Sequence, residues 1–170
     1  MKKYFSMLLV LAMCFVACDG KKSKEKNEDS AAHQGPVFVD LGLPSGTKWK
    51  AVNEEGYYDY DAAAEKYGAY LPTKEQFQEL IACCIWEWNG DDYVGEGYVV
   101  KGANGNSILL PAAGYRNCYG DVSYVGTYGY YWSSTPDDSD YAWTLTFNSS
   151  EVTMRNYYRC YGLSVRLFQN

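Results

Sequence analysis

The stretch from Leu109 to Arg166 constrains the possible fold more than any other part of the sequence. Segments rich in Pro, Gly, Trp, Leu and Val alternate here with segments of Tyr, Asn, Asp, Ser and Cys that hold almost no aliphatic residue. The first kind sets turns and fills cores. The second kind offers rigid aromatic contact area and adaptable hydrogen bonds, as binding surfaces do. Because 10 of the 18 tyrosines lie in this stretch, it predicts a rigid scaffold that displays an aromatic surface.

The first residues are typical of an export signal. Lys2 and Lys3 precede an apolar run from Met7 to Ala17, which is too short to cross a bilayer. Cys18 follows a small residue, and this order resembles the lipobox of bacterial lipoproteins, in which the cysteine is lipidated and becomes the new N-terminus. We therefore predict a lipoprotein signal peptide over residues 1–17, a lipid on Cys18 and a surface-exposed position at the outer membrane. The alternative is a secretory signal cut elsewhere, with Cys18 an ordinary thiol.

Charge and composition divide the remainder into a tether and one domain. Residues 19–36 hold no aliphatic side chain larger than Ala, so residues 18–36 are expected to be a flexible tether. Residues 37–170 are enough for a single domain with a real core. The net charge is −6, and removal of Lys2 and Lys3 makes it −8. This acidity argues against nucleic acid or anionic headgroups as partners, so contact with the membrane would run through the lipid.

Cysteine and histidine usage gives no metal or cofactor site. Four cysteines remain beyond the signal region and Cys18, namely Cys83, Cys84, Cys118 and Cys160. An oxidising compartment allows a disulfide, for which Cys118 with Cys160 is one candidate, and free thiols are an equal alternative. The spacings match no zinc pattern, and the domain holds no His.

Periodicity predicts an α+β fold, with one or two helices followed by a loop-rich, mostly antiparallel sheet. Tyr58–Tyr67 is Ala-rich and is stopped by Gly68. Leu71–Cys84 is the clearer helix, because Thr73 and Gln76 have the spacing of a capping box. Its apolar face, at helical spacing, consists of Phe77, Leu80, Ile81 and Cys84.

Strands are predicted where apolar and polar residues alternate between turn residues. We expect them at residues 37–43, 47–52, 85–88, 97–102, 106–111, 141–147 and 163–168. The first and last of these can pair and bring the ends of the domain together. The tryptophans assigned to the core are Trp49, Trp86, Trp132 and Trp143, while Trp88 suits either core or surface.

The strand Tyr141–Phe147 alternates most regularly. Successive side chains of a strand point to opposite faces. The inward set is expected to be Trp143, Leu145 and Phe147, and the outward set Ala142, Thr144 and Thr146. Thr144 and Thr146 are therefore candidates for a ligand-facing surface.

Several motifs recur in one order in a known family. They are VDLGLPSGTKW, LPTKEQFQELI, C-x-W-x-W, NGNSILLPAAGYR, GYYWSST and G-x-SVR, and the resemblance covers residues 37–168. With these motifs the chain resembles the Fibrobacter succinogenes major paralogous domain family. The resemblance implies a C-type-lectin-like fold of the formylglycine-generating-enzyme kind, in secreted or lipid-anchored proteins.

The C-terminal part also resembles the variable proteins of diversity-generating retroelements, in which mutagenised template adenines convert Asn codons into Tyr, Ser, Asp, Cys or Gly codons. The resemblance implies a variable ligand-binding region over residues 115–166, with RNYYRCYGLSVR as its most telling part. The implied ligand-binding residues are Asn117, Tyr119, Asp121, Ser123, Tyr124, Tyr128, Asp137, Asp138, Asp140, Thr144, Thr146, Asn156, Tyr157, Tyr158 and Tyr161. The alternative is a fixed family member whose loops are rich in tyrosine.

Catalytic chemistry finds little support in the sequence. Without His in the domain, Ser-His-Asp and Cys-His nucleophile sites are absent. Asp91, Asp92 and Glu96 could serve a glycosidase, but a solvated turn is favoured. The acidic run Asp137–Asp140 could ligate Ca²⁺, yet an acidic surface loop is favoured. Arg116 and Arg166 are assigned structural roles.

We expect a surface-tethered, non-catalytic and monomeric lipoprotein whose diversified lectin-fold surface binds a variable protein or glycan on another cell, phage or host. A fixed cell-envelope or fimbria-associated structural or adhesin lipoprotein is the alternative, and an enzyme is a weaker third. The first hypothesis predicts one exposed patch that contains Tyr119, Tyr124, Tyr128, Tyr157, Tyr158 and Tyr161.

Overall fold

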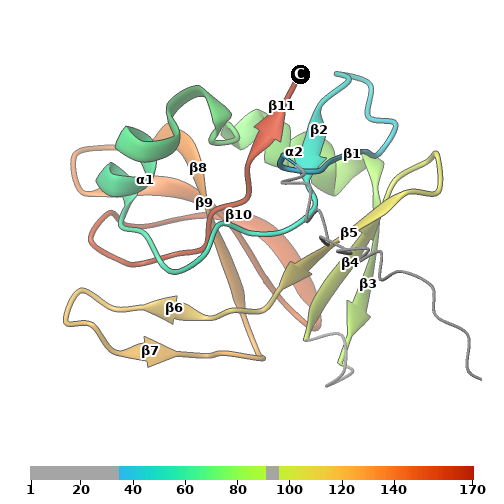
Figure 1. Cartoon of the computed structure of the whole chain (residues 1–170). Coiled ribbons are helices and arrows are strands. Elements are labelled where there is room, and N and C mark those ends of the chain that lie inside the picture. Colours follow the sequence, from blue (N-terminus) through green and yellow to red (C-terminus); the bar gives the residue numbers. More distant parts are fainter. Residues whose placement is uncertain (1–34, 91–95) are drawn as a thin grey trace, which may run out of the picture. The chain divides into compact units, whose positions relative to one another are not determined.

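A computed structural model describes residues 35–90 and 96–170, which form an α+β architecture of short helices and antiparallel strands (Figure 1). This confirms the predicted fold class at the level of α+β. The expected signal peptide, the lipidated Cys18 and nearly all of the expected tether lie outside the described residues, as do Asp91 and Asp92.

Helix α1 (Tyr60–Tyr67) begins where the side chain of Asp59 accepts a hydrogen bond from the backbone N–H of Ala62 at 2.8 Å. The helix therefore starts two residues later than the sequence pattern indicates. It ends at Gly68, whose φ of +48° lies in the left-handed region that glycine adopts without steric cost. The 3₁₀ helix η1 (Gly68–Tyr70) then leads toward the second helix.

Helix α2 (Lys74–Cys83) confirms the predicted capping box. The hydroxyl of Thr73 accepts from the backbone N–H of Gln76, and the side chain of Gln76 accepts from the backbone N–H of Thr73 at 2.8 Å. Phe77 and Leu80 are fully buried beneath the helix, as the apolar spacing predicts.

The two ends of the domain meet in a three-stranded antiparallel sheet. Its strands are β1 (Phe38–Asp40), β2 (Lys48–Lys50) and β11 (Phe168–Gln169), with β2 in the middle. The prediction that the first and last strands pair with each other is therefore wrong. Trp49 of β2 stands opposite both Val39 and Phe168, so β2 has a strand on each side, and β11 adds to β2 instead of β1.

A second sheet is an antiparallel meander. It contains β3 (Ile85–Asn89), β4 (Gly97–Lys101) and β5 (Ser107–Pro111), and the predicted hairpin joins the last two. Trp86 and Trp88 lie on one side of β3, where both rings contact Tyr98 and Phe147. Trp88 is thus partly buried against the core.

The third sheet holds the longest strands and has the order β10–β9–β8. Its members are β8 (Gly129–Pro136), β9 (Tyr141–Asn148) and β10 (Glu151–Tyr158), all antiparallel. A short hairpin of β6 (Tyr115–Arg116) and β7 (Val122–Ser123) precedes it (Figure 1). Gly129 is required opposite Phe147, because a Cβ atom at this position would overlap the phenyl ring.

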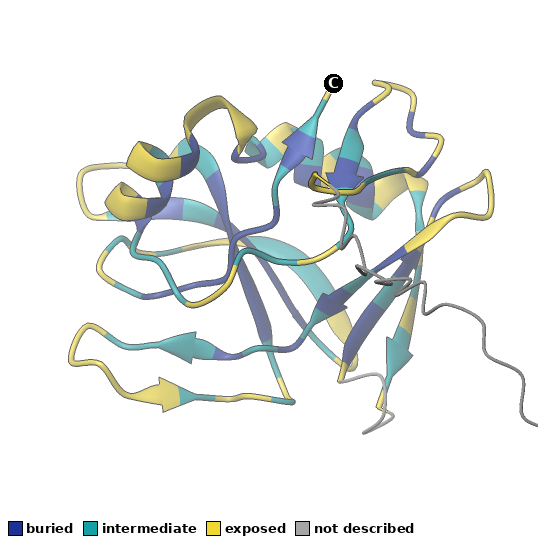
Figure 2. Ribbon diagram, viewed as in Figure 1, coloured by how far each residue is buried: buried dark blue, intermediate teal, exposed yellow. Residues whose placement is uncertain are grey.

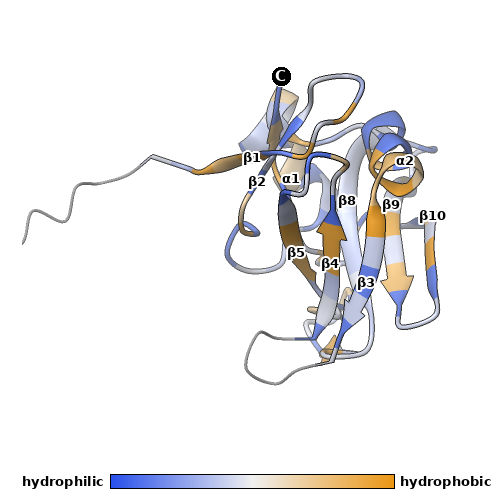
Figure 3. Cartoon of the chain, turned by 90° about the vertical axis from the view of Figure 1, so that its right-hand side faces the viewer, coloured by the Kyte–Doolittle hydropathy of each residue, from blue (hydrophilic) through white to orange (hydrophobic). Residues whose placement is uncertain are grey.

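The central strand β9 is covered on both faces, which corrects the expected outward set. On one face Leu145 and Phe147 join the core formed with α2 and the second sheet. On the other face Ala142 packs in a second cluster. Thr144 and Thr146 are 0% and 5% exposed, so the prediction that they face outward is wrong. Figure 2 shows β8 and β9 largely in the buried colour, and Figure 3 shows the hydrophobic colour on β4 and β5 of the second sheet, whereas β8 is pale.

The second cluster explains why β9 has no solvent face. It contains Tyr60 from α1, Trp132 from β8, and Leu163 and Val165 from the segment before β11. This segment follows β8 closely, since the backbone N–H of Trp132 donates to the carbonyl of Ser164 at 3.1 Å. The middle of β9 is therefore enclosed between two apolar clusters, whereas β10 keeps exposed residues.

The sequence assigns Trp143 to the core and Arg166 to a structural role, and the structure confirms only the second assignment. Trp143 is only half-buried, and the ammonium of Lys74 lies over its ring at 3.0 Å from the centroid. Arg166 is fully buried and donates hydrogen bonds to backbone and amide oxygens, which confirms its structural role.

Candidate functional site

Eight tyrosines form one continuous chain of ring contacts, with centroid separations from 4.4 to 6.3 Å. We name this set the tyrosine cluster; it consists of Tyr115, Tyr124, Tyr128, Tyr130, Tyr141, Tyr157, Tyr158 and Tyr161. The cluster links the β6–β7 hairpin to β8, β9, β10 and the turn after β10. Offset and edge-to-face ring pairs stabilise such arrangements by about 0.5–1.5 kcal/mol each beyond the burial of area.

The six tyrosines predicted to form one exposed patch do lie together, but their exposure is uneven. Tyr119 is 93% exposed, and Tyr124 and Tyr158 are also exposed. Tyr128, Tyr157 and Tyr161 are half-buried and present only part of each ring. The prediction is thus confirmed for position and only in part for exposure.

A hollow of about 440 Å³ lies at one end of the tyrosine cluster. Its walls are Tyr115, Tyr119, Tyr158 and Tyr161, together with Asn117 and the Cys118–Cys160 disulfide. The volume falls in the range of roughly 300–1,000 Å³ that is usual for small-ligand sites. We call this feature the aromatic hollow.

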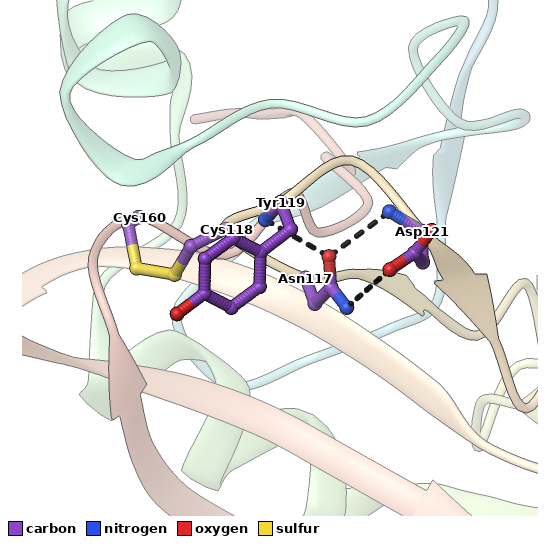
Figure 4. The surroundings of a disulfide bond; sticks show 5 residues. All are labelled: Asn117, Cys118, Tyr119, Asp121 and Cys160. Atoms are coloured by element: carbon purple, nitrogen blue, oxygen red, sulfur yellow. Dashed lines mark hydrogen bonds between the residues drawn. A yellow bond between two sulfur atoms is a disulfide. The ribbon is translucent and has the colours of Figure 1, made fainter.

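The disulfide between Cys118 and Cys160 holds together two segments that line the aromatic hollow. It joins the β6–β7 hairpin to the turn after β10, 42 residues away, with the two Cα atoms 5.2 Å apart (Figure 4). The sequence leaves open either a disulfide or free thiols at these two cysteines, and the structure contains the disulfide. Among the cysteines that the structure describes, Cys83 and Cys84 are free, the first exposed and the second half-buried.

Asn117 shapes the turn that carries Tyr119. Its side-chain oxygen accepts hydrogen bonds from the backbone N–H groups of Tyr119 and Asp121, both at 2.9 Å. Its amide nitrogen donates to the carboxylate of Asp121 at 3.1 Å (Figure 4). Asn117 is thus occupied with the turn, whereas Tyr119 projects into solvent.

The acidic residues between β8 and β9 also organise a turn. One carboxylate oxygen of Asp138 accepts from the backbone N–H groups of Asp140 and Tyr141, both at 2.8 Å. Asp137 accepts from the side chain of Asn156 at 2.6 Å. Within residues 35–90 and 96–170 no three His, Cys, Asp or Glu side chains gather in a way that could hold a metal ion.

Of the remaining predicted site residues, Ser123 and Tyr124 are at least partly exposed, whereas Thr144 and Thr146 are buried. Ser123 is half-buried in β7 opposite Tyr115, and Tyr124 has a left-handed φ of 61° that turns its ring onto Tyr115. Thr144 cannot reach a ligand from its buried position, because the second apolar cluster covers it. Thr146 is also enclosed, but it lines the floor of a separate polar pocket.

The structure adds residues that the sequence prediction missed. Tyr115 and the two bridged cysteines line the aromatic hollow, and Tyr130 and Tyr141 complete the ring contacts. The GYR motif at residues 114–116 and the GYY motif at residues 129–131 contain Tyr115 and Tyr130, but neither motif indicates which way a ring points.

Three phenols of the cluster, those of Tyr115, Tyr130 and Tyr141, have a raised pKa. Burial raises the pKa of Tyr115 and of Tyr130 above the usual value for a phenol. A hydrogen bond with Tyr158, aided by burial, raises the pKa of Tyr141 to about 12. These three tyrosines therefore keep hydroxyl groups that can both donate and accept hydrogen bonds.

Fold and site together define an α+β domain with an aromatic surface fixed by a disulfide. A family model described as a domain of unknown function (DUF8237) matches residues 84–168, which is half of the chain. The chain belongs to this family. The matched residues run from the end of α2 into β11 and include the whole tyrosine cluster.

Two other comparisons gave no match, either among curated proteins or among solved structures. Among the described residues, no helix has the length and apolar character that crossing a bilayer requires.

Proposed function

We propose that this chain is a non-catalytic, lipid-anchored protein of the cell envelope that binds a ligand through the tyrosine cluster and its aromatic hollow. The observation that carries the proposal is the hollow itself. Exposed tyrosines gather around a cavity of ligand size, and a disulfide and an Asn-capped turn hold its walls in place. Rigid walls lower the entropy cost of binding.

The lining favours binding over catalysis. Its side chains are phenols, an amide and a disulfide. Phenols titrate near pH 10, far from the range in which general acids and bases operate at neutral pH. Aromatic faces with hydroxyl edges suit a protein or a glycan ligand.

We further propose a C-type-lectin-like fold and a lipid on Cys18 at the outer membrane surface. The sequence motifs support the fold, and the α+β architecture with its two terminal strands in one sheet is compatible with it. Cys18 lies outside the described residues, so its lipid is tested directly by mass spectrometry of the protein from its own membranes.

The binding proposal is tested with the full chain, a glycan array and a panel of intact bacterial cells. The variant Tyr119→Ser/Tyr158→Ser should lose at least ten-fold in binding to any glycan or cell that the natural chain retains. Tyr70→Ser is the matched control, since Tyr70 is 62% exposed but lies outside the tyrosine cluster. Equal binding by the two variants would contradict the proposal.

Diversification of the surface is proposed for the exposed positions, with Tyr119, Asp121 and Tyr158 among them. Sequencing the codons for residues 115–166 in sibling isolates should show changes confined to template adenines, beside a near-copy repeat in the flanking DNA. Codon 144 should be constant, because its side chain is buried.

A fixed envelope or adhesin protein is the second candidate, and one observation favours it. Asn117, Asp138 and the paired Cys118 and Cys160 all hold turns or loops in place. Random change at these positions would remove the contacts that order the surface. Invariant codons with no flanking repeat would select this candidate and leave the tyrosine cluster as a surface for one constant partner.

A further inference from the structure

Strand β10 is an open edge of its sheet. The order β10–β9–β8 places β9 on one side of it, and no strand of the described chain pairs with its other side. Figure 3 shows β10 at the outer side of β9. The strand pairs with β9 over all eight residues without a register shift, and its sequence EVTMRNYY contains no Pro. It thus lacks two devices that commonly protect an edge strand from another chain, a proline and a β-bulge.

The hydrogen-bond pattern shows which backbone groups of β10 face outward. The backbone N–H of Arg159 donates to the carbonyl of Asp140 at 2.8 Å, in a pair that continues the register of β9 and β10 by one step. In an antiparallel ladder, hydrogen-bonded pairs alternate with pairs whose backbone groups point away from each other. Odd-numbered residues of β10 therefore bond to β9. Val152, Met154 and Asn156 point their N–H and C=O groups away from it.

The sequence of β10 is complementary to itself when two copies run antiparallel about Thr153. Thr153 then stands opposite its own counterpart, and Glu151 stands opposite Arg155. On the other face of the strand, Val152 stands opposite Met154. Each charge thus meets the opposite charge, and each apolar side chain meets an apolar one. Such cross-strand pairs stabilise the pairing of two strands.

The outward backbone groups allow this same register. Val152 of one copy and Met154 of the other would form the hydrogen-bonded pairs of the new ladder, because both residues point their groups outward. Glu151 and Arg155 would fall on the alternate positions, where opposite side chains come closer. A shift by one residue would set outward groups against inward ones. A shift by two would keep the backbone bonds but would part Glu151 from Arg155.

Glu151 and Arg155 are both accessible to a second copy. Their ion pair within the strand has a separation of 3.1 Å, yet each side chain keeps about half of its surface exposed. An exposed pair of this kind contributes little to stability, so exchanging its partners costs little. We propose that β10 pairs with β10 of a second copy about Thr153, in a two-fold dimer that joins the two sheets into one. This dimer would replace the monomer expected from the sequence.

Pairing about this axis would place two tyrosine clusters on one face of the joined sheet. Tyr157 lies on the same face of β10 as Thr153, because alternate side chains of a strand share a face. A two-fold axis between paired antiparallel strands is perpendicular to the sheet, so this face is common to both copies. If the tyrosine cluster binds a ligand as proposed above, two linked clusters would hold a multivalent ligand more tightly than one. The dimer itself does not depend on that function.

The test compares the purified full chain with the variants Glu151→Arg and Arg155→Glu by sedimentation in solution. Each variant sets like charges opposite each other across the axis, so the dissociation constant of the dimer should rise at least ten-fold. An equal mixture of the two variants should restore dimers, because every charged position then faces the opposite charge. The double variant Glu151→Arg/Arg155→Glu should dimerise like the natural chain. The matched control is Glu65→Arg, which reverses an exposed charge on α1 and should change nothing.

Amide hydrogen exchange tests the register of the pairing. The amides of Val152 and Met154 should exchange at least ten-fold more slowly at a protein concentration that favours the dimer than at one that favours the monomer. The amides of Thr153 and Arg155 should change less, because they already bond to β9. Exchange in the β6–β7 hairpin should be the same at both concentrations.

Several outcomes would overturn the proposal. These are a monomer at millimolar concentration, single variants that dimerise like the natural chain, or a mixture that dimerises no better than its two components. Protection of Val152 and Met154 that does not depend on protein concentration would also overturn it, and would assign the edge to another segment of the same chain. The Tyr119→Ser/Tyr158→Ser variant should still dimerise, so this proposal and the ligand-binding role of the aromatic hollow can fail separately.

Discussion

Arg166 donates a hydrogen bond from its guanidinium to the backbone carbonyl of Leu109 across the interior of the domain. The same guanidinium donates to the carbonyl of Lys50 at 2.7 Å and to the side-chain oxygen of Asn53 at 2.8 Å. One buried cation thus ties together β2, the loop after it and β5. Burial lowers the pKa of Arg166, and the neutral oxygens around it compensate for the lost hydration.

Replacement of Arg166 by Met should destabilise the fold by about 3 kcal/mol or more, because three buried acceptors lose their donor. Arg166→Lys should also destabilise, since one ammonium cannot span the three acceptors. Guanidinium unfolding measures both changes. The control is Arg155→Met, where an exposed pair with Glu151 is removed and a change within about 1 kcal/mol is expected. A loss at Arg166 no larger than that of the control would contradict this account.

The Cys118–Cys160 disulfide should contribute about 2–4 kcal/mol, since it closes a loop of 42 residues in the unfolded chain. The double variant Cys118→Ser/Cys160→Ser should lose this amount in urea unfolding and should show faster amide exchange in the β6–β7 hairpin. Cys83→Ser, at an exposed free thiol, should remain within about 0.5 kcal/mol of the natural chain. Unchanged exchange in the hairpin would show that the bridge does not order the aromatic hollow.

Alkaline pH should destabilise the fold in a range set by the buried phenols. Burial raises the pKa of Tyr131 to about 12, so the folded state holds this proton more tightly than the unfolded chain does. The resulting stability is fully present below about pH 10, the phenol value in unfolded chains, and is lost as the pH rises toward 12. Unfolding free energies measured between pH 8 and 12 would show the decline.

The variant Tyr131→Phe separates the alkaline loss of stability due to Tyr131 from the contributions of other tyrosines. The hydroxyl of Tyr131 donates to the carbonyl of Pro111 at 2.7 Å and accepts from Asn53 at 3.1 Å. Its removal should cost about 1–3 kcal/mol at pH 7 and should make the alkaline decline shallower. Tyr119→Phe, at a fully solvated ring, should change neither. An equal alkaline slope in Tyr131→Phe would assign the decline to other tyrosines.

Thr144 and Thr146 should respond differently to substitution, although they face the same way from β9. Thr146→Val removes a buried hydroxyl that has no hydrogen-bond partner among the described residues, and it keeps the shape, so we expect no loss, or a gain of up to about 1 kcal/mol. Thr144→Asn inserts a larger polar side chain into a fully buried position and should cost about 1–3 kcal/mol. Thermal or urea unfolding of the two variants measures both changes in the free energy of unfolding. A tolerant position 144 would restore it as a candidate for diversification.

Local signals predicted the parts of the fold that depend on neighbours in sequence. The capping box of Thr73 and Gln76, the stop at Gly68 and the hairpin of β4 and β5 all involve residues within a few positions of one another. Their geometry is fixed by short-range hydrogen bonds and φ preferences, which the residue types reveal.

The wrong predictions concern residues whose burial or strand pairing is set by segments distant in sequence. Alternation in β9 shows which residues share a face, but only the packing of α1 and the segment before β11 shows that Thr144 is covered. In the same way, Trp49 of β2 stands opposite both Val39 of β1 and Phe168 of β11, and no local pattern indicates that these distant segments meet there. A single pattern of hydrophobic residues cannot distinguish one covering layer from two.

The residue types of the candidate site were predictable from the sequence, but the burial of each side chain was not. Tyrosine density pointed to the region from Tyr115 to Tyr161, and the structure places these rings in one cluster. Which rings are exposed depends on the stacking of side chains from four strands, and no local signal encodes it. Tyr128 and Tyr157 are half-buried for this reason, whereas Tyr119 at the tip of a turn is free.

The bridge between Cys118 and Cys160 has a consequence for how this surface can evolve. A change at either cysteine alone would leave an unpaired thiol beside the aromatic hollow, open to oxidation or to mixed disulfides in an oxidising compartment. The two codons are therefore expected to be inherited as a pair, present together or absent together. In a population of related chains they would mark two lineages of surface, one with a fixed hollow and one with a loose β6–β7 hairpin.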